Sequence, residues 1–172
     1  MNLILNANST ESTDYEIRNT TKAVVVNNEG KVLLFTYNLI GGGVDEGETF
    51  EGALHREALE EAGVEIEIVK PLGEVIAYRD FLKKKYVTKG FLCKVVKTIS
   101  EPTTTDEAEK ARPLLVENPQ NSIARLKKQI ADLEKENPEK YEGDTYQAHL
   151  YNQQTTLAFL IEAKSSIEEL HP

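Results

Sequence analysis

Three glutamates, Glu57, Glu60 and Glu61, lie within one helical turn of each other. On an α-helix, residues three or four positions apart share one face, so these carboxylates would lie side by side. Like charges at this spacing weaken a helix by about 0.2–0.5 kcal/mol per pair. Arg56 can pair with Glu60, but neither position 57 nor position 65 holds a basic residue that could pair with Glu61. A bound cation would relieve the repulsion, and clustered carboxylate oxygens suit Mg²⁺ or Mn²⁺.

A glycine-rich segment precedes these acids, and the whole stretch resembles the signature of the Nudix hydrolases. That signature is G-x5-E-x7-R-E-U-x-E-E-x-G-U, where U is a bulky aliphatic residue. Residues 42–64 match it at Gly42, Glu48, Arg56, Glu57, Glu60, Glu61, Gly63 and Val64. Ala58 is small for its U position. The alternative is a solvated helix face rich in Glu by propensity, which does not account for the fixed Gly and Arg positions.

The resemblance implies a role for each charged residue of this segment. It implies that Glu57, Glu60 and Glu61 coordinate Mg²⁺ or Mn²⁺ directly. Arg56 could bind a phosphate group, or it could form an ion pair with Glu48 that holds loop and helix in register. We favour the ion pair. Glu48 then has a supporting role or acts as an occasional metal ligand.

Gly41, Gly42 and Gly43 stand directly before the acidic segment. Glycine permits a tight turn and a close approach of the backbone to a metal-bound substrate. We therefore expect this loop to bind the substrate together with its metal ion. An ordinary turn is the alternative.

Diphosphate cleavage also requires a general base that activates water. In some Nudix enzymes the base is the first Glu of the Arg-Glu pair, which corresponds to Glu57 here. In others it is an acid in a loop after the last strand, and Glu101, Glu107 and Glu109 are candidates of that kind. We favour a solvated loop position for each of these three, and the sequence leaves the identity of the base open.

The charge of the chain restricts its partners. The 172 residues carry a formal net charge of −9, and residues 41–64 hold seven acids against the single base Arg56. A nucleic-acid polymer requires a basic surface, so this composition argues against such a partner. A small phosphorylated molecule that arrives with Mg²⁺ is compatible, because the metal ion reverses the local charge.

The chain shows no sign of secretion or of a membrane span. Residues 1–20 contain no leading basic residues, and no apolar stretch approaches the length needed to cross a bilayer. Cys93 is the only cysteine, so no intrachain disulfide can form. Its apolar neighbours predict a core position. We expect a soluble cytoplasmic protein.

Apolar periodicity predicts the elements that position the acidic segment. Two β-branched runs at residues 23–26 and 31–35 flank an Asn-Asn-Glu-Gly sequence, which indicates a hairpin. A helix is predicted over residues 49–62, with Thr49 as its N-cap and Gly63 as its end. Its apolar stripe consists of Phe50, Leu54, Ala58 and Ala62.

Further strands and two more helices are predicted after this helix. The strands occupy residues 64–68, 74–78 and about 86–97, with a charged hairpin tip at residues 79–85. Amphipathic helices are predicted at residues 122–135 and 145–170, separated by Pro138.

This order of elements is similar to that of the Nudix fold. The resemblance implies an α/β (α+β) architecture in which a mixed β-sheet is sandwiched between helices (α/β/α). We expect a Nudix hydrolase domain over residues 1–137 and a C-terminal helical extension over residues 138–172. The extension could pack on its own domain, which we favour, or contribute to a homodimer interface.

Residues outside the signature must select the substrate. Tyr78, Phe81 and Tyr86 could stack on a nucleobase, while Arg79 or the lysines at 83–85 could contact distal phosphates. We favour core or hairpin packing for these aromatic residues and a solvated turn for the lysines. The three histidines lack metal-like spacing and are predicted to be structural or on the surface; they are His55, His149 and His171.

Departures from the family leave the substrate class open. Ile40 replaces the proline that often precedes the paired glycines, and tryptophan is absent. The downstream motifs of members that cleave NADH, ADP-ribose or dinucleoside polyphosphates are also missing. The expected function is that of a Mg²⁺-dependent pyrophosphohydrolase. Its substrate would be a nucleoside diphosphate linked to another group, such as a nucleoside triphosphate, ADP-ribose or a nucleotide sugar.

Two rival functions share the same fold. One is a sensor that binds nucleotides without cleaving them, but such proteins usually have an eroded signature, whereas this one is complete. The other is an isoprenoid diphosphate isomerase, which would need a catalytic cysteine. The apolar strand around Cys93 is the wrong setting for one.

Overall fold

The computed structural model describes residues 1–5, 14–99, 101–103 and 114–170. Its centre is a six-stranded sheet with the strand order β1-β4-β5-β2-β3-β6. The strands are β1 (Asn2–Leu5), β2 (Glu16–Val26), β3 (Val32–Leu34), β4 (Val64–Arg79), β5 (Lys84–Thr98) and β6 (Leu115–Glu117). Strand β1 runs parallel to β4 and β2 runs parallel to β5, while the other pairs are antiparallel. The predicted mixed sheet is therefore confirmed.

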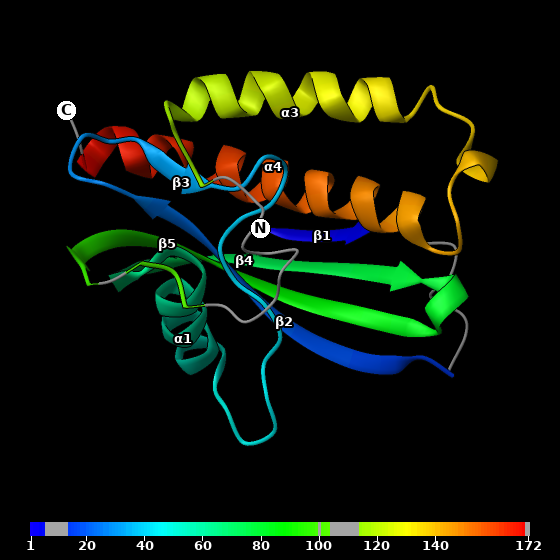
Figure 1. Ribbon diagram of the computed structural model, residues 1–172, viewed down its shortest axis with the longest axis horizontal. Helices are drawn as coiled ribbons and strands as arrows, with labels where there is room; N and C mark the ends of the chain where they lie inside the picture. Colours follow the sequence, from blue (N-terminus) through cyan, green and yellow to red (C-terminus); the bar gives the residue numbers. More distant parts are fainter. Residues whose placement is uncertain (6–13, 100, 104–113, 171–172) are drawn as a thin grey trace.

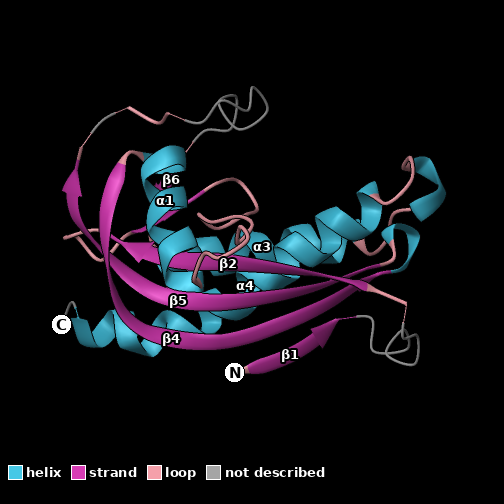
Figure 2. Cartoon of the chain, turned by 90° about the horizontal axis from the view of Figure 1, so that it is seen from below, coloured by secondary structure: helices cyan, strands magenta, loops and turns pink. Residues whose placement is uncertain are grey.

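Within the described residues, three α-helices cover the two faces of this sheet (Figures 1 and 2). They are α1 (Phe50–Ala62), α3 (Pro119–Leu133) and α4 (Thr145–Leu170). Helix α1 packs on β2 and β4 from one side, whereas α4 packs on β4, β2 and β5 from the other, and α3 lies against α4. Short 3₁₀ turns at Asp80–Leu82 (η2) and Pro138–Lys140 (η3) complete the chain order. No helix of the described segments is both long and apolar enough to cross a bilayer.

Two hydrophobic clusters hold the layers together, one on each face of the sheet. Alternate residues of β2 enter different clusters: Val25 faces α1, whereas Val24 faces α4. The long helix α4 contributes Phe159 and Leu160, both fully buried. A Cβ on Gly90 of β5 would lie 2.2 Å from Cε1 of Phe159, so the absence of a side chain at residue 90 makes room for that ring. Helix α4 is thus part of the same core as the sheet.

Helix α1 is built as its apolar stripe predicts. Leu54, Ala58 and Ala62 are buried. The Thr49 side chain accepts a hydrogen bond from the Gly52 N–H, and Gly63 ends the helix in the left-handed conformation at φ 64°. The apolar stripe fixes the rotation of the helix, and this in turn directs the acidic face toward the glycine-rich loop.

The prediction of two strands at residues 64–68 and 74–78 is wrong, because β4 is continuous from Val64 to Arg79. Its register against β5 shifts between Glu65 and Ile66, between Ile68 and Lys70, and between Pro71 and Gly73. These irregularities let the strand continue through Pro71 and Gly73, residues that otherwise interrupt strands.

Other boundaries also differ from the predictions. Strand β2 begins at Glu16 instead of residue 23, because its polar first half pairs with β5 along its whole length. The short edge strands β1 and β6 were not predicted. Helix α3 begins three residues earlier than expected, at Pro119, and α4 has the predicted bounds. Cys93 is fully buried, as predicted, and burial raises the pKa of its thiol to about 12.

Candidate active site

The glycine-rich loop lies along the outer edge of β2. The Thr21 N–H donates to the Gly42 carbonyl and the Ala23 N–H donates to the Ile40 carbonyl, each at 2.9 Å. Gly41 has φ +126°, and a Cβ there would lie 2.2 Å from the Thr21 carbonyl oxygen. Residue 41 must therefore be glycine for the loop to follow this strand.

Glu61 connects helix α1 to this loop. Its side chain is nearly buried, with 7% of the residue exposed, and its Oε2 accepts a hydrogen bond from the Gly41 N–H at 2.8 Å. A buried carboxylate is costly unless it is hydrogen-bonded or paired with a cation. Glu61, the last glutamate of the signature, thus holds the glycine loop against the helix.

Glu57 approaches the loop at the next glycine. A Cβ on Gly42 would lie 2.4 Å from Glu57 Oε1, so only a residue without a side chain leaves space for the carboxylate. Burial raises the pKa of Glu57 above the ordinary glutamate value, although nearby Arg56 and Lys22 act in the opposite direction. Lys22 Nζ donates hydrogen bonds to the carbonyls of Leu39, at 3.1 Å, and Gly41.

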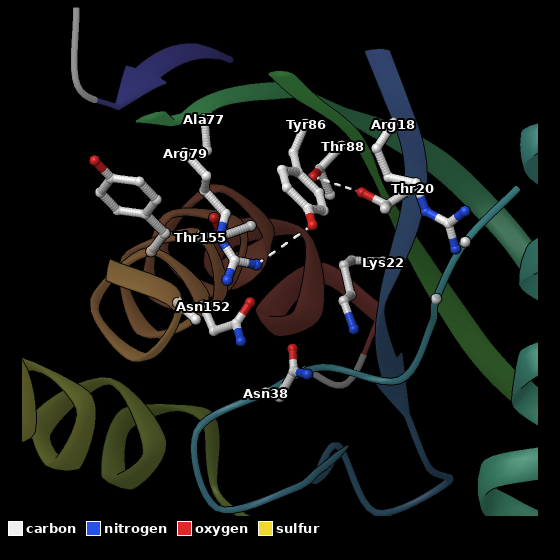
Figure 3. A pocket seen from close by; sticks show the side chains of 14 residues that line it. Arg18, Thr20, Lys22, Asn38, Ala77, Arg79, Tyr86, Thr88, Asn152 and Thr155 are labelled. Carbon is white, nitrogen blue, oxygen red and sulfur yellow. Dashed lines mark hydrogen bonds between the residues drawn. The ribbon is translucent and has the colours of Figure 1, made fainter. Parts of the chain in front are cut away.

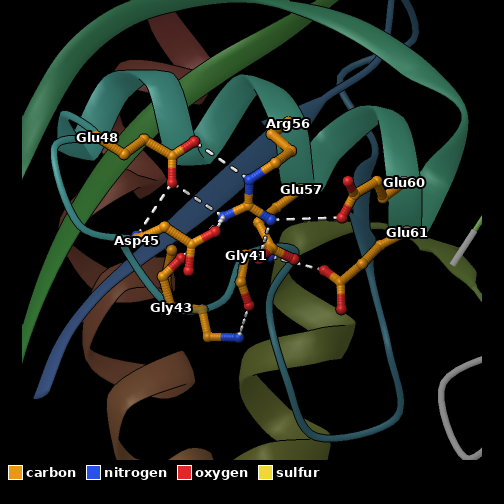
Figure 4. Close-up of polar contacts among 9 residues, drawn as sticks. Gly41, Gly43, Asp45, Glu48, Arg56, Glu57, Glu60 and Glu61 are labelled. Atoms are coloured by element: carbon orange, nitrogen blue, oxygen red, sulfur yellow. Dashed lines mark hydrogen bonds and ion pairs between the residues drawn. The ribbon is translucent and has the colours of Figure 1, made fainter. Parts of the chain in front are cut away.

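Arg56 is the centre of the acidic cluster (Figure 4). Its Nε and Nη2 donate to the two carboxylate oxygens of Glu48, both at 3.1 Å, and Nη2 also donates to the Gly43 carbonyl at 2.9 Å. Its Nη1 donates to Glu57 at 2.9 Å and to Glu60 at 3.3 Å. In the structure Arg56 therefore has the ion pair with Glu48 that the sequence favoured, joining loop and helix.

The electrostatics of the cluster follow from these contacts. The hydrogen bond from Arg56 lowers the pKa of Glu48, and the same carboxylate raises the pKa of the Arg56 guanidinium. One guanidinium thus serves Glu48, Glu57 and Glu60 together. The cluster keeps an excess of negative charge.

This donor set fits a hard divalent cation in its chemistry. Glu57, Glu60 and Glu61 lie on one face of α1, and oxygen atoms of this kind are the preferred ligands of Mg²⁺ and Mn²⁺. Within the described residues, no three acidic, His or Cys side chains already form a metal cage. The carboxylates of Glu57 and Glu60 instead contact Arg56.

The residues predicted from outside the signature have different positions. Glu101 is exposed, while Glu107, Glu109 and His171 lie outside the described residues. His55 is exposed, and the His149 ring lies 5.6 Å from the Tyr37 ring. Within the described residues, neither histidine contacts the acidic cluster.

A cavity of about 280 Å³ borders the glycine loop on the α4 side of the sheet (Figure 3). Of the predicted substrate contacts, Arg79 and Tyr86 line this cavity. Tyr78 is buried at 8% exposure, and Phe81 is exposed at the hairpin tip. The lysines at 83–85 are not among the lining residues of the described chain.

Sequence reasoning missed two cations of this cavity, Arg18 and Lys22. Arg18, Thr20 and Lys22 alternate along β2, and side chains two residues apart on a strand share a face. This alternation was the available signal. The predicted strand begins at residue 23 and therefore leaves both cations outside it.

Comparison with known proteins agrees with the signature. A family model described as the NUDIX domain matches residues 17–135. A NUDIX hydrolase structure from Nitrosomonas europaea is 20% identical with a TM-score of 0.53, covering 64% of this chain and 78% of that chain. A MutT protein structure from Methanosarcina mazei Go1 is 19% identical with a TM-score of 0.51, covering 66% of this chain and 85% of that one.

A third similar structure is the E. coli ORF135 protein in solution. It is 16% identical with a TM-score of 0.50, and the match covers 64% of this chain and 79% of that chain. Identities this low show likeness of fold. No curated protein sequence matches the chain. Helix α4 lies beyond the segment that the family model matches.

Proposed function

Because this chain belongs to the Nudix family and has its fold, we propose that it is a Mg²⁺- or Mn²⁺-dependent pyrophosphohydrolase. Its proposed substrate is a nucleoside diphosphate linked to another group, with nucleoside triphosphates, ADP-ribose and nucleotide sugars as the leading classes. One observation carries the proposal: three of the signature acids and the Gly43 carbonyl contact the single guanidinium of Arg56, the acids being Glu48, Glu57 and Glu60. An intact constellation of this kind favours catalysis over a sensor without activity.

In this proposal Glu57, Glu60 and Glu61 hold the divalent ion. When bound, the ion would neutralise phosphoryl oxygens and lower the pKa of a water molecule. Arg56 and Glu48 position the helix relative to Gly41, Gly42 and Gly43, so that the loop backbone can approach the metal-bound diphosphate. The support for these roles is the contact of Arg56 with both Glu48 and the Gly43 carbonyl.

Glu57 is the best supported candidate for the general base. Its place in the signature is that of the base in some Nudix enzymes, and its carboxylate lies against Gly42, which lines the cavity. Glu101 is the one described alternative, but it is exposed and has no contact with the signature acids in the described structure.

Two cationic side chains of β2 could bind phosphate groups beside the acidic cluster. Arg18 and Lys22 line the cavity beside Gly42 and Gly43, whereas no acidic side chain of the described residues lines it. A diphosphate that bridges the acidic cluster and the cavity would therefore meet metal ions on one side and these cations on the other. This arrangement supports a small anionic substrate.

We retain residues 1–137 and 138–172 as a proposed division into Nudix domain and helical extension. The buried Phe159 and Leu160 favour packing of the extension on its own domain. Size-exclusion chromatography tests whether the protein also forms a homodimer through other surfaces.

The proposal is tested with a panel of nucleoside triphosphates, ADP-ribose and nucleotide sugars in the presence of Mg²⁺ or Mn²⁺. Separation of the products by chromatography should show two phosphorylated fragments from at least one compound, and none when the metal is chelated. Tight nucleotide binding without any phosphorylated product would instead support the sensor.

A further inference from the structure

The cavity beside the glycine loop has one wall that the family segment does not supply. Strands β2, β4 and β5 contribute Arg18, Arg79 and Tyr86, while α4 contributes Tyr151, Asn152 and Thr155. The α4 residues lie beyond residues 17–135, the segment that the family model matches. The cavity is therefore closed by a helix that lies outside the matched segment (Figure 3).

The guanidinium of Arg79 is held in a fixed plane inside this cavity. It forms an ion pair with Asp144, which is buried at 8% exposure in the turn before α4. Its Nη1 donates to the Tyr86 hydroxyl at 3.4 Å, and its central carbon lies 5.2 Å from the centroid of the Tyr86 ring. Because Asp144 neutralises the charge of Arg79, the Arg79 end of the cavity offers the planar face of the guanidinium and little net charge.

A flat guanidinium over an aromatic ring is a platform on which nucleobases stack. Asn152 lies on the facing wall, and its amide offers one donor and one acceptor to the edge of a base. At the opposite end, the Arg18 guanidinium lies against Gly43 and has no ion pair or hydrogen bond within the described residues. The cavity thus offers, in order, a cation for a phosphate and a planar platform with a polar edge.

We propose that this cavity binds the nucleoside part of the substrate. The base stacks on the Arg79 plane, Asn152 contacts its polar edge, and Arg18 binds the first phosphate before the chain reaches the acidic cluster. Asp144 is a positioning residue that orients Arg79. Helix α4 therefore determines which base is accepted. This inference rests on the proposed function for the claim that the substrate is a nucleotide.

The test measures binding in the full-length protein without metal, so that it does not depend on hydrolysis. The probes are AMP, GMP, CMP, UMP and ribose 5-phosphate, titrated by isothermal calorimetry. At least one nucleotide should bind about tenfold or more tightly than ribose 5-phosphate, which lacks a base. Equal affinity for all five probes, or no binding of any nucleotide, would overturn the proposal.

Matched variants assign the binding to named residues. Arg79→Lys keeps the positive charge opposite Asp144 but loses the plane, and should remove most of the advantage of the nucleotide over ribose 5-phosphate. Asn152→Ala should change the order of preference among the four bases, and provides the test if Arg79→Lys does not fold. Gln154 lies on α4 but does not line the cavity. Gln154→Ala should therefore change neither the advantage of the nucleotide over ribose 5-phosphate nor the order of preference among the bases.

An unchanged advantage over ribose 5-phosphate in folded Arg79→Lys, or an unchanged order of base preference in folded Asn152→Ala, would contradict the role given to that residue. That failure is distinct from failure of the proposed function. Hydrolysis that persists without base-selective binding would overturn only the inference. Base-selective binding without any hydrolysis would overturn only the enzymatic activity.

Discussion

The carboxylate of Glu57 occupies the space that a side chain on residue 42 would require. A Cβ on Gly42 would lie 2.4 Å from Glu57 Oε1 and 2.7 Å from its carboxyl carbon. The glycine of the signature is thus explained by the glutamate that lies fifteen positions later. The relationship joins the loop that borders the cavity to the helix that carries the acids.

Replacing Gly42 with alanine should displace the Glu57 carboxylate without unfolding the chain. Gly42 does not have a positive φ, so alanine is tolerated by the backbone and only the carboxylate must move. Misplacement of a reacting group by about 1 Å can lower a rate on the order of a hundredfold, and we expect a fall of that size in kcat/KM. Steady-state kinetics provide the measurement.

Gly52→Ala is the control for this variant, because Gly52 lies in α1 and a Cβ there would meet Thr49 Oγ1 at 3.2 Å and Glu48 Cγ at 3.5 Å, but not the Glu57 carboxylate. It should retain close to parental kinetics. Equal loss of activity in both glycine variants would indicate a general effect on the helix instead of a displaced Glu57.

Arg56→Lys should weaken the site although it preserves the charge. One ammonium group cannot reproduce the two-pronged contact with Glu48 together with the bonds to Glu57 and the Gly43 carbonyl. We expect kcat/KM to fall by about tenfold to a hundredfold. In the Arg56→Lys background, adding Glu48→Gln should cost little more, because the paired contact is already lost. Independent, additive effects in this double-mutant cycle would contradict the coupling.

The raised pKa of Glu57 predicts a pH dependence of stability in the metal-free protein. A carboxyl group whose folded pKa is raised stabilises the fold below its unfolded pKa, and loses this contribution as pH rises through the folded pKa. Glu57→Gln stays neutral, so it should melt at a higher temperature than the parent at neutral pH. The difference should shrink toward about pH 4. Thermal unfolding in chelator gives this comparison, and a variant less stable at neutral pH would refute it.

The packing of α4 on the sheet can be tested at Gly90 and Phe159. Gly90→Ala would bring a Cβ to 2.2 Å from the Phe159 ring, and should lower the free energy of unfolding by about 1–3 kcal/mol. Phe159→Ala should lower it by about 3–5 kcal/mol. In the double variant the overpacking disappears, so the loss should be smaller than the sum. Denaturant titrations measure all three, and strict additivity would show that the two residues do not touch in solution.

Local features of the sequence predicted helix α1 well. Its N-cap Thr49, its apolar stripe and the terminating Gly63 all lie within the element itself, so no distant partner was needed. Strands β1 and β6 could not be predicted in the same way. Each has only three or four residues, and their pairing depends on distant segments, as between Asn2 and Glu74.

The part of the candidate site that could be predicted is the set of acids whose spacing is fixed by the signature. The acids of α1 followed from the signature, and their contacts with Arg56 and Gly41 are local to that segment. Arg79 and Tyr86 were considered for substrate binding, but the sequence could not place them against α4. Asn152 reaches the cavity, and Asp144 reaches Arg79, only through the packing of a helix that begins at residue 145, whereas β4 ends at residue 79. No local pattern reports this packing.

The most direct test of the account is the turnover of Glu61→Gln, compared with Glu51→Gln in the same helix. Glu61 is a proposed metal ligand, whereas Glu51 is an exposed acid of the first turn, outside the cluster. Circular dichroism first establishes that both variants are folded, and product release is then measured on the best substrate of the panel with saturating Mg²⁺. We expect loss of turnover for Glu61→Gln, as for Glu60→Gln, and near-parental turnover for Glu51→Gln. A folded Glu61→Gln protein that cleaves the substrate at the parental rate would contradict it.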